Sequence, residues 1–104
     1  MLLINIDRIP GKEFEVLSMV FGSTVQSKHI GKDIGAALKT LVGGEIVAYT
    51  DMMNTSREIA TNRMISEAEK IGADAIIGVR YSSSAVMDGA SEVMAYGTAV
   101  KFKN

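Results

Sequence analysis

The sequence predicts a two-layer α+β fold, in which a small antiparallel sheet of about three main strands packs against one long and one short helix in the order β-α-α-β-β. Three observations support this prediction. A charge-free apolar run extends from Val16 to Ser27, a helix-periodic segment ends before Gly72, and two β-rich segments flank the turn sequence "DGAS". The 104 residues have the length of one domain, so residues 1–104 are assigned to a single unit.

The first strand and the short helix are expected in the N-terminal half of the chain. After the turn at Pro10-Gly11, the stretch "KEFEVLSMVFGSTVQS" predicts a long strand with a bend at Gly22. In the next stretch, "KHIGKDIGAALKTLVGG", apolar residues recur at helical spacing at Ala36, Ala37, Leu38 and Leu41. The Gly43-Gly44 pair is a natural stop for this short helix.

The segment from Asp51 to Ile71 predicts a long helix with one apolar stripe. The stripe consists of Met52, Met53, Ser56, Ile59, Ala60, Met64, Ala68 and Ile71. Gly72 is placed to end the helix in the left-handed conformation. Thr55 with Glu58 would form a capping box, whereas Gly44 followed by Glu45 would start the helix earlier, and we favour the early start.

The C-terminal third predicts a β-hairpin. The stretch "ADAIIGVRYSSSAVM" has the Ile and Val content of a strand, and "EVMAYGTAVKF" returns after the turn. The pattern Glu-x-x-Ala-Tyr occurs both at Glu45 and at Glu92. Its contexts predict a helix at the first position and a strand at the second, so we do not interpret it as an internal repeat.

Both faces of the predicted sheet are apolar. In the first long strand, Val16, Val20 and Gly22 alternate with Leu17, Met19 and Phe21, so neither face is marked as solvent-exposed by polar residues. One long and one short helix can cover a single face. Because 47% of all residues are apolar, the second face is expected to be buried by another copy of the chain.

Composition excludes several classes of function. A formal net charge of -1 gives no basic field for binding nucleic acid, and the absence of Cys removes disulfides and thiolate chemistry. The apolar patch at the start, in "MLLINIDRIPGKEFEV", is too short for a signal peptide. No apolar run in the sequence approaches the ~20 residues of a membrane span. We therefore expect a soluble cytoplasmic protein with neither nucleic-acid nor membrane partners.

Three stretches carry a resemblance to a known family. They are "IPGKEFEVLSMVFGSTVQSKHIGKDIGAALKTLVGGEIVAYTDMM", "SREIATNRMISEAEKIGADAIIGVRY" and "EVMAYGTAV". Together they cover nearly the whole chain, which resembles the YbjQ-type family, whose members are labelled heavy-metal-binding. The resemblance implies a dodecin-like subunit that assembles into a ring, typically a homopentamer.

The chain has few of the side chains that bind heavy metals. The chain has His29 as its single histidine and has no Cys, whereas zinc and softer metals prefer grouped Cys and His ligands. A metal site therefore requires an assembly interface, where several copies of His29 meet or where His29 lies beside Asp33. The methionines on the helical stripe are interpreted as core residues.

Candidate ligand-binding residues are Lys28, His29, Lys32 and Arg80. The first three surround Gly31 before a predicted helix start, where anions are attracted, although a solvated turn capped by Asp33 is the favoured interpretation. Arg80 follows "AIIGV" within a strand. It should therefore pair with a carboxylate, within the chain or across a subunit boundary, or line a pocket, and the ion pair is favoured.

These observations favour a homo-oligomeric ring protein without catalytic activity that holds a small ligand between subunits. We assign no catalytic residue, because no pattern brings His29 to the serines at 82–84. No cofactor is expected apart from a divalent metal. The alternative function is heavy-metal binding at an interface through His29, and a weaker alternative is an enzyme with a composite interface site.

Overall fold

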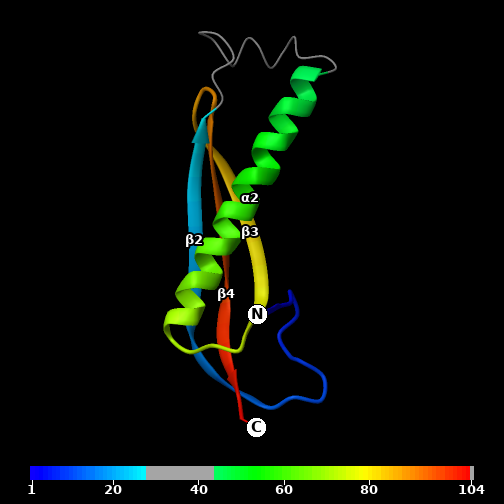
Figure 1. Ribbon diagram of the computed structural model, residues 1–104, viewed down its shortest axis with the longest axis vertical. Coiled ribbons are helices and arrows are strands. Elements are labelled where there is room, and N and C mark those ends of the chain that lie inside the picture. Colours follow the sequence, from blue (N-terminus) through cyan, green and yellow to red (C-terminus); the bar gives the residue numbers. More distant parts are fainter. Residues whose placement is uncertain (28–43, 104) are drawn as a thin grey trace.

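The computed structural model describes residues 1–27 and 44–103, and side chains within α2 from Val47 onward. These residues form β1 (Leu2–Leu3), β2 (Phe14–Ser27), α2 (Gly44–Lys70), β3 (Ala75–Met87) and β4 (Ala90–Phe102). The helix α2 crosses one face of a four-stranded sheet with the order β1-β3-β4-β2 (Figure 1). The predicted α+β class is confirmed, while the predicted short helix falls on residues outside the described part.

The sheet is centred on β4. Strand β2 runs antiparallel to β4 from the pair Phe14↔Phe102 to the pair Ser27↔Ala90. Strands β3 and β4 form the predicted hairpin, which turns at Asp88-Gly89 with a φ of +80° at Gly89. The sequence did not predict β1, which pairs in parallel with β3, because two residues are too few to show strand periodicity.

Gly22 has a packing role in β2. The register between β2 and β4 is continuous through Gly22 and shifts instead between Val16 and Ser18. A methyl group on Gly22 would overlap the backbone of Ala60 and Met64 in α2. The absent side chain therefore allows the helix backbone to lie directly on the strand.

Helix α2 begins at Gly44, as the early-start interpretation predicted. Its buried side chains recur at every fourth position, at Ser56, Ala60, Met64 and Ala68. Gly72 has a φ of +78°, and the amides of Gly72 and Ala73 donate to the carbonyls of Glu69 and Ala68 in a Schellman motif. Ile71 lies beyond the helix and is 46% exposed, so its predicted place on the buried stripe is wrong.

Two apolar clusters hold the layers together. The larger cluster lies between α2 and the sheet and includes Met64, Ile76 and Ala95. The smaller one lies on the opposite sheet face, where Ile4 and Ile9 of the N-terminal segment pack near Val100. No helix in the described ranges is long and apolar enough to span a membrane.

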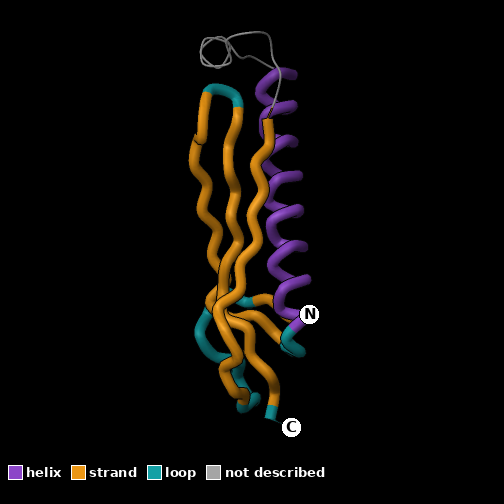
Figure 2. Tube along the Cα trace, turned by 90° about the vertical axis from the view of Figure 1, so that its left-hand side faces the viewer, coloured by secondary structure: helices purple, strands orange, loops and turns teal. Residues whose placement is uncertain are grey.

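The molecule is elongated rather than spherical. Its principal extents are 54 × 22 × 15 Å and its Cα radius of gyration is 17.0 Å, against about 13 Å for a compact domain of this length. Figure 2 shows the reason, because the long strands and the single described helix lie side by side in two thin layers. Among the described residues, much of one sheet face is therefore without a covering layer.

Candidate functional site

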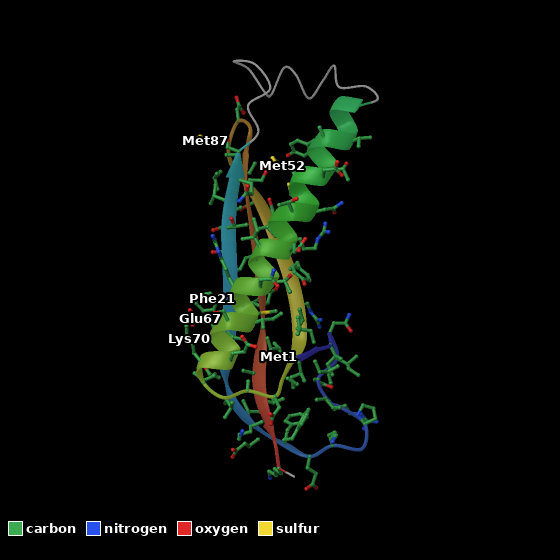
Figure 3. The ribbon with its side chains drawn as sticks, viewed as in Figure 1. Met1, Phe21, Met52, Glu67, Lys70 and Met87 are labelled. Atoms are coloured by element: carbon green, nitrogen blue, oxygen red, sulfur yellow. The ribbon has the colours of Figure 1, made fainter. Side chains whose placement is uncertain are left out.

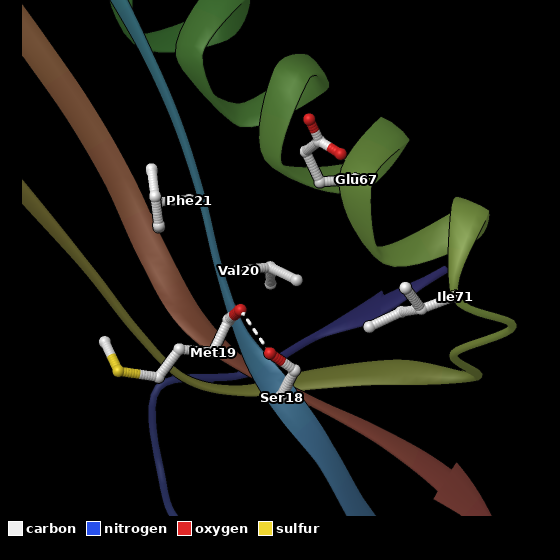
Figure 4. Close-up of a pocket in the computed structure, with 6 residues that line it drawn as sticks. All are labelled: Ser18, Met19, Val20, Phe21, Glu67 and Ile71. Atoms are coloured by element: carbon white, nitrogen blue, oxygen red, sulfur yellow. Dashed lines mark hydrogen bonds between the residues drawn. The ribbon is translucent and has the colours of Figure 1, made fainter.

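The sheet face opposite α2 carries an apolar surface on β2. Alternation along the strand directs Val20 and Thr24 toward α2, so Met19, Phe21 and Val25 point to the other side. Figure 4 shows this difference for Val20 and Met19. Three residues on this side are largely exposed, namely Met19 at 66%, Phe21 at 60% and Val25 at 56%. The register shift between Val16 and Ser18 brings Val16, which is 64% exposed, to the same side.

Strand β4 extends the same apolar surface. Thr98, Tyr96 and Met94 lie opposite Met19, Phe21 and Ser23, and all three are half-buried. We call the surface formed by the four exposed β2 residues and these three β4 residues the open face. Figure 3 shows Phe21 on the outer side of β2, and no described segment covers this part of the sheet.

The sheet also has two free edges within the described residues. The outer edge of β2 has no neighbouring strand, since β2 is the last strand in the order. On the other side, β1 and the segment after it reach β3 only as far as Val79. Every residue of β3 from Arg80 to Met87 is exposed, and no described strand pairs with the outer edge of this half of the strand.

Pockets lie on both sides of α2. On the β2 side, Phe21, Glu67 and Ile71 line a pocket of about 250 Å³ (Figure 4). A second pocket on this side, of about 320 Å³, shares Phe21 and Glu67 with the first and is also lined by Arg63 and Lys70. On the β3 side, a pocket of about 200 Å³ is lined by Met53, Arg57, Tyr81, Ser82, Ser83 and Val93. The helix therefore has two adjoining pockets on its β2 side and one pocket on its β3 side.

Three arginines beside these edges are held by neutral oxygen atoms. Arg57 Nη1 donates to Asn54 Oδ1 at 2.9 Å, and Arg63 Nη1 donates to the Ser23 carbonyl at 2.7 Å. Arg80 Nη1 donates to the Asn5 carbonyl at 3.0 Å. The ion pair found among the described residues is Lys70 with Glu67 at 3.6 Å, so none of the three guanidinium charges is compensated there.

The structure places Arg80 differently from the sequence-based expectation. We expected a charge inside a strand to be desolvated and to need a carboxylate, but Arg80 is exposed because the covered part of β3 ends at Val79. Its partner in the described part of the chain is a main-chain carbonyl. A carboxylate from another subunit remains a prediction.

The other candidate residues lie outside the described ranges. Lys28, His29 and Lys32 fall within 28–43, so their proximity to Arg80 stays a prediction. Within the described residues, no group of three or more His, Cys, Asp or Glu side chains is placed to hold a metal ion. These residues of a single chain therefore do not fit a heavy metal.

Sequence reasoning missed the pocket between α2 and β3. In the sequence, the serines at 82–84 are considered only as nucleophiles, and Arg57 is not among the candidate binding residues. Tyr81 Oη lies 2.8 Å from Thr61 Oγ1, which ties β3 to the helix one turn after Arg57. The helical spacing of Arg57 and Thr61 indicated that they share one side of α2. The pattern could not show that this side meets Tyr81 of β3.

Relatives with closely similar sequences are known from several bacteria. A UPF0145 protein of Alkaliphilus metalliredigens is 65% identical, over 98% of this chain and 99% of its own length. UPF0145 proteins of Clostridium novyi and Thermosipho africanus are 62% and 61% identical, over 97% and 99% of this chain and 98% and 96% of theirs. The similarity thus extends over full chains on both sides.

A solved structure supports the fold. The crystal structure of a protein of unknown function from Pediococcus pentosaceus, assigned to the DUF74 family, matches with a TM-score of 0.73 over 99% of this chain and 98% of that one. Its sequence identity of 15% limits the comparison to the fold. The family model described as "Putative heavy-metal-binding" matches residues 1–103. The chain therefore belongs to the YbjQ family, whose members are also named UPF0145 proteins.

Proposed function

We propose that this chain is the subunit of a cytoplasmic, non-enzymatic homo-oligomeric ring, and that neighbouring copies cover the open face and the free sheet edges. The observation that carries the proposal is the open face itself. Four large apolar side chains on one strand are each more than half exposed, next to an unpaired strand edge. Monomeric proteins avoid this combination because it promotes edge-to-edge association.

The two free edges are suited to a head-to-tail contact. Strands β2 and β3 are both antiparallel to β4, so they run in the same direction. Rotation about a ring axis preserves strand direction relative to that axis. The β2 edge of one copy can therefore pair in parallel with the outer half of β3 in the next copy, and repeated contacts of this kind close a ring.

Shape and family resemblance support the same proposal. An elongated subunit with thin layers buries little of its own surface, so further stability must come from neighbouring copies. The family resemblance implies a pentamer, which we take as the expected copy number. A small ligand bound between subunits would lie along the contacts that the ring creates.

The test is the oligomeric state of the wild-type protein and of Phe21→Asp at micromolar concentration. We expect native mass spectrometry to show a closed oligomer for the wild type and dissociation for Phe21→Asp, because a carboxylate on the open face cannot be desolvated without a partner. Asn62→Asp adds the same charge on the exposed side of α2 and should leave the oligomer intact. A folded wild-type monomer would refute the proposal.

A metal function through His29 is the second candidate, and the description of the family favours it. One histidine per chain and no Cys cannot complete a tight site, so such a metal would be shared between subunits. Elemental analysis of purified, untagged protein separates this candidate from a ring that holds no metal.

A further inference from the structure

The pocket between α2 and β3 has the chemistry of an anion site. Its floor is formed by Met53 and the buried Val93, and its rim carries Arg57, Tyr81 and Ser83. No carboxylate is among its lining residues. A small pocket with a guanidinium group, hydroxyl groups and an apolar floor favours an oxyanion over a cation.

The hydrogen bonds between α2 and β3 determine which hydroxyl groups around the pocket act as donors. Thr61 Oγ1 lies 2.7 Å from the Arg57 carbonyl, to which it donates its single proton. Tyr81 must then donate to Thr61 Oγ1 across the 2.8 Å contact between them. This bond uses the single proton of the phenol, so Tyr81 ties the strand to the helix and offers no donor to a ligand. Arg57 donates through Nη1 to the neutral Asn54 side chain, and its other N–H groups have no partner among the described residues.

The β2 edge presents a second guanidinium group, in the same row of the sheet, that has no ion pair among the described residues. Ser23 of β2 and Ser82 of β3 both lie opposite Met94 of β4, so they occupy one row. Arg63 donates to the Ser23 carbonyl and is therefore anchored in that row. If β2 of one copy lies beside β3 of the next without stagger, Arg63 reaches the pocket of its neighbour.

We propose that each seam between subunits binds a small phosphate-type oxyanion, held by Arg57 and Ser83 of one copy, next to Tyr81, and by Arg63 of the next. The assignment rests on the proposed ring, because the site is incomplete without the neighbouring copy. Two guanidinium groups match the charge of a phosphate dianion better than that of a carboxylate. The nearby Lys70 is paired with Glu67 and is left outside the site.

Isothermal titration calorimetry with inorganic phosphate tests the proposal, with chloride at matched ionic strength and acetate as comparison ions. We expect saturable phosphate binding that weakens about tenfold or more in Arg57→Gln and in Arg63→Gln, as for loss of a charged hydrogen bond. Arg8→Gln removes the same charge from the N-terminal segment and should leave the affinity unchanged. Ser83→Ala should have a smaller effect in the same direction.

The outcomes separate this inference from the assembly on which it rests. An intact oligomer without saturable phosphate binding, or with equal losses in Arg57→Gln and Arg8→Gln, would overturn the anion site but not the ring. Acetate binding as tightly as phosphate would overturn the phosphate assignment. A monomer that binds phosphate through Arg57, with no effect of Arg63→Gln, would overturn the ring and the neighbour's contribution.

Discussion

Two glycines illustrate how a single residue can be required for different physical reasons. Gly72 needs conformational freedom, because its φ of +78° is strained for other residues, while a side chain there would meet nothing within 4 Å. Gly22 needs space, because α2 lies where its side chain would be. The sequence predicted the role of Gly72, since a glycine after a periodic helix is a recognisable signal. It could not predict that of Gly22, whose neighbour is almost forty positions away in the chain.

Substitutions at these glycines should separate the two reasons. Gly72→Ala is expected to lower the free energy of unfolding by about 1 kcal/mol, and Gly72→Asn by less, because Asn tolerates the left-handed conformation. Gly22→Ala should cost more, roughly 1–3 kcal/mol, because the helix must move away from the strand. Chemical denaturation at fixed protein concentration measures these changes. Equal costs for Gly22→Ala and Gly72→Ala would contradict the packing role of Gly22.

At the level of elements, the pattern Glu-x-x-Ala-Tyr shows that a five-residue sequence does not by itself decide between helix and strand. The copy beginning at Glu45 lies in α2 and the copy beginning at Glu92 lies in β4, as their contexts predicted. Flanking signals were sufficient, since the Gly pair before one copy and the turn before the other differ. The strand β3 was also predicted over its full length, but β1 and the free outer edge of β3 were not, because edge position depends on neighbouring strands rather than on periodicity.

The outer half of β3 offers a test at this scale. In an antiparallel pair, alternate amides of Arg80–Met87 point toward β4 and the others point away from it. If another copy pairs with this edge, the outward amides should exchange with solvent roughly as slowly as the inward ones, whereas a free edge exchanges orders of magnitude faster. Residue-resolved hydrogen exchange by NMR measures both sets. The inward amides are the internal control, and rapid exchange of the outward set within the oligomer would exclude pairing through β3.

At the scale of the whole molecule, metal binding should depend on assembly. A single His29 per chain predicts weak sites with fewer metal ions than subunits, since three or four ligands are needed for a tight site. Titration of untagged protein with zinc, copper and nickel should show this stoichiometry, and His29→Ala should lose most of the affinity. Tight binding of one ion per chain that persists in His29→Ala would show that other ligands form the site.

The sequence predicts that another copy of the chain covers one sheet face, but it does not predict which part of that face is exposed in a single chain. Alternating apolar residues on both faces indicated that α2 alone could not cover the sheet. The pattern did not distinguish Val100, which the N-terminal segment buries, from Phe21, which remains exposed. Periodicity shows which side chains share a face, whereas the path of an irregular segment decides which part of that face is covered.

The shared direction of β2 and β3 determines where a domain fused to the chain would lie in the proposed ring. Figure 1 shows the hairpin turn and the start of α2 at one end of the molecule and the C-terminus at the other. In a ring built by rotation alone, every subunit points the same way, so the assembly is polar, with two chemically different rims. A domain fused after Phe102 would therefore be present once per subunit, with all copies on the same rim. The opposite rim, which carries the hairpin turns, would remain available for a second attachment.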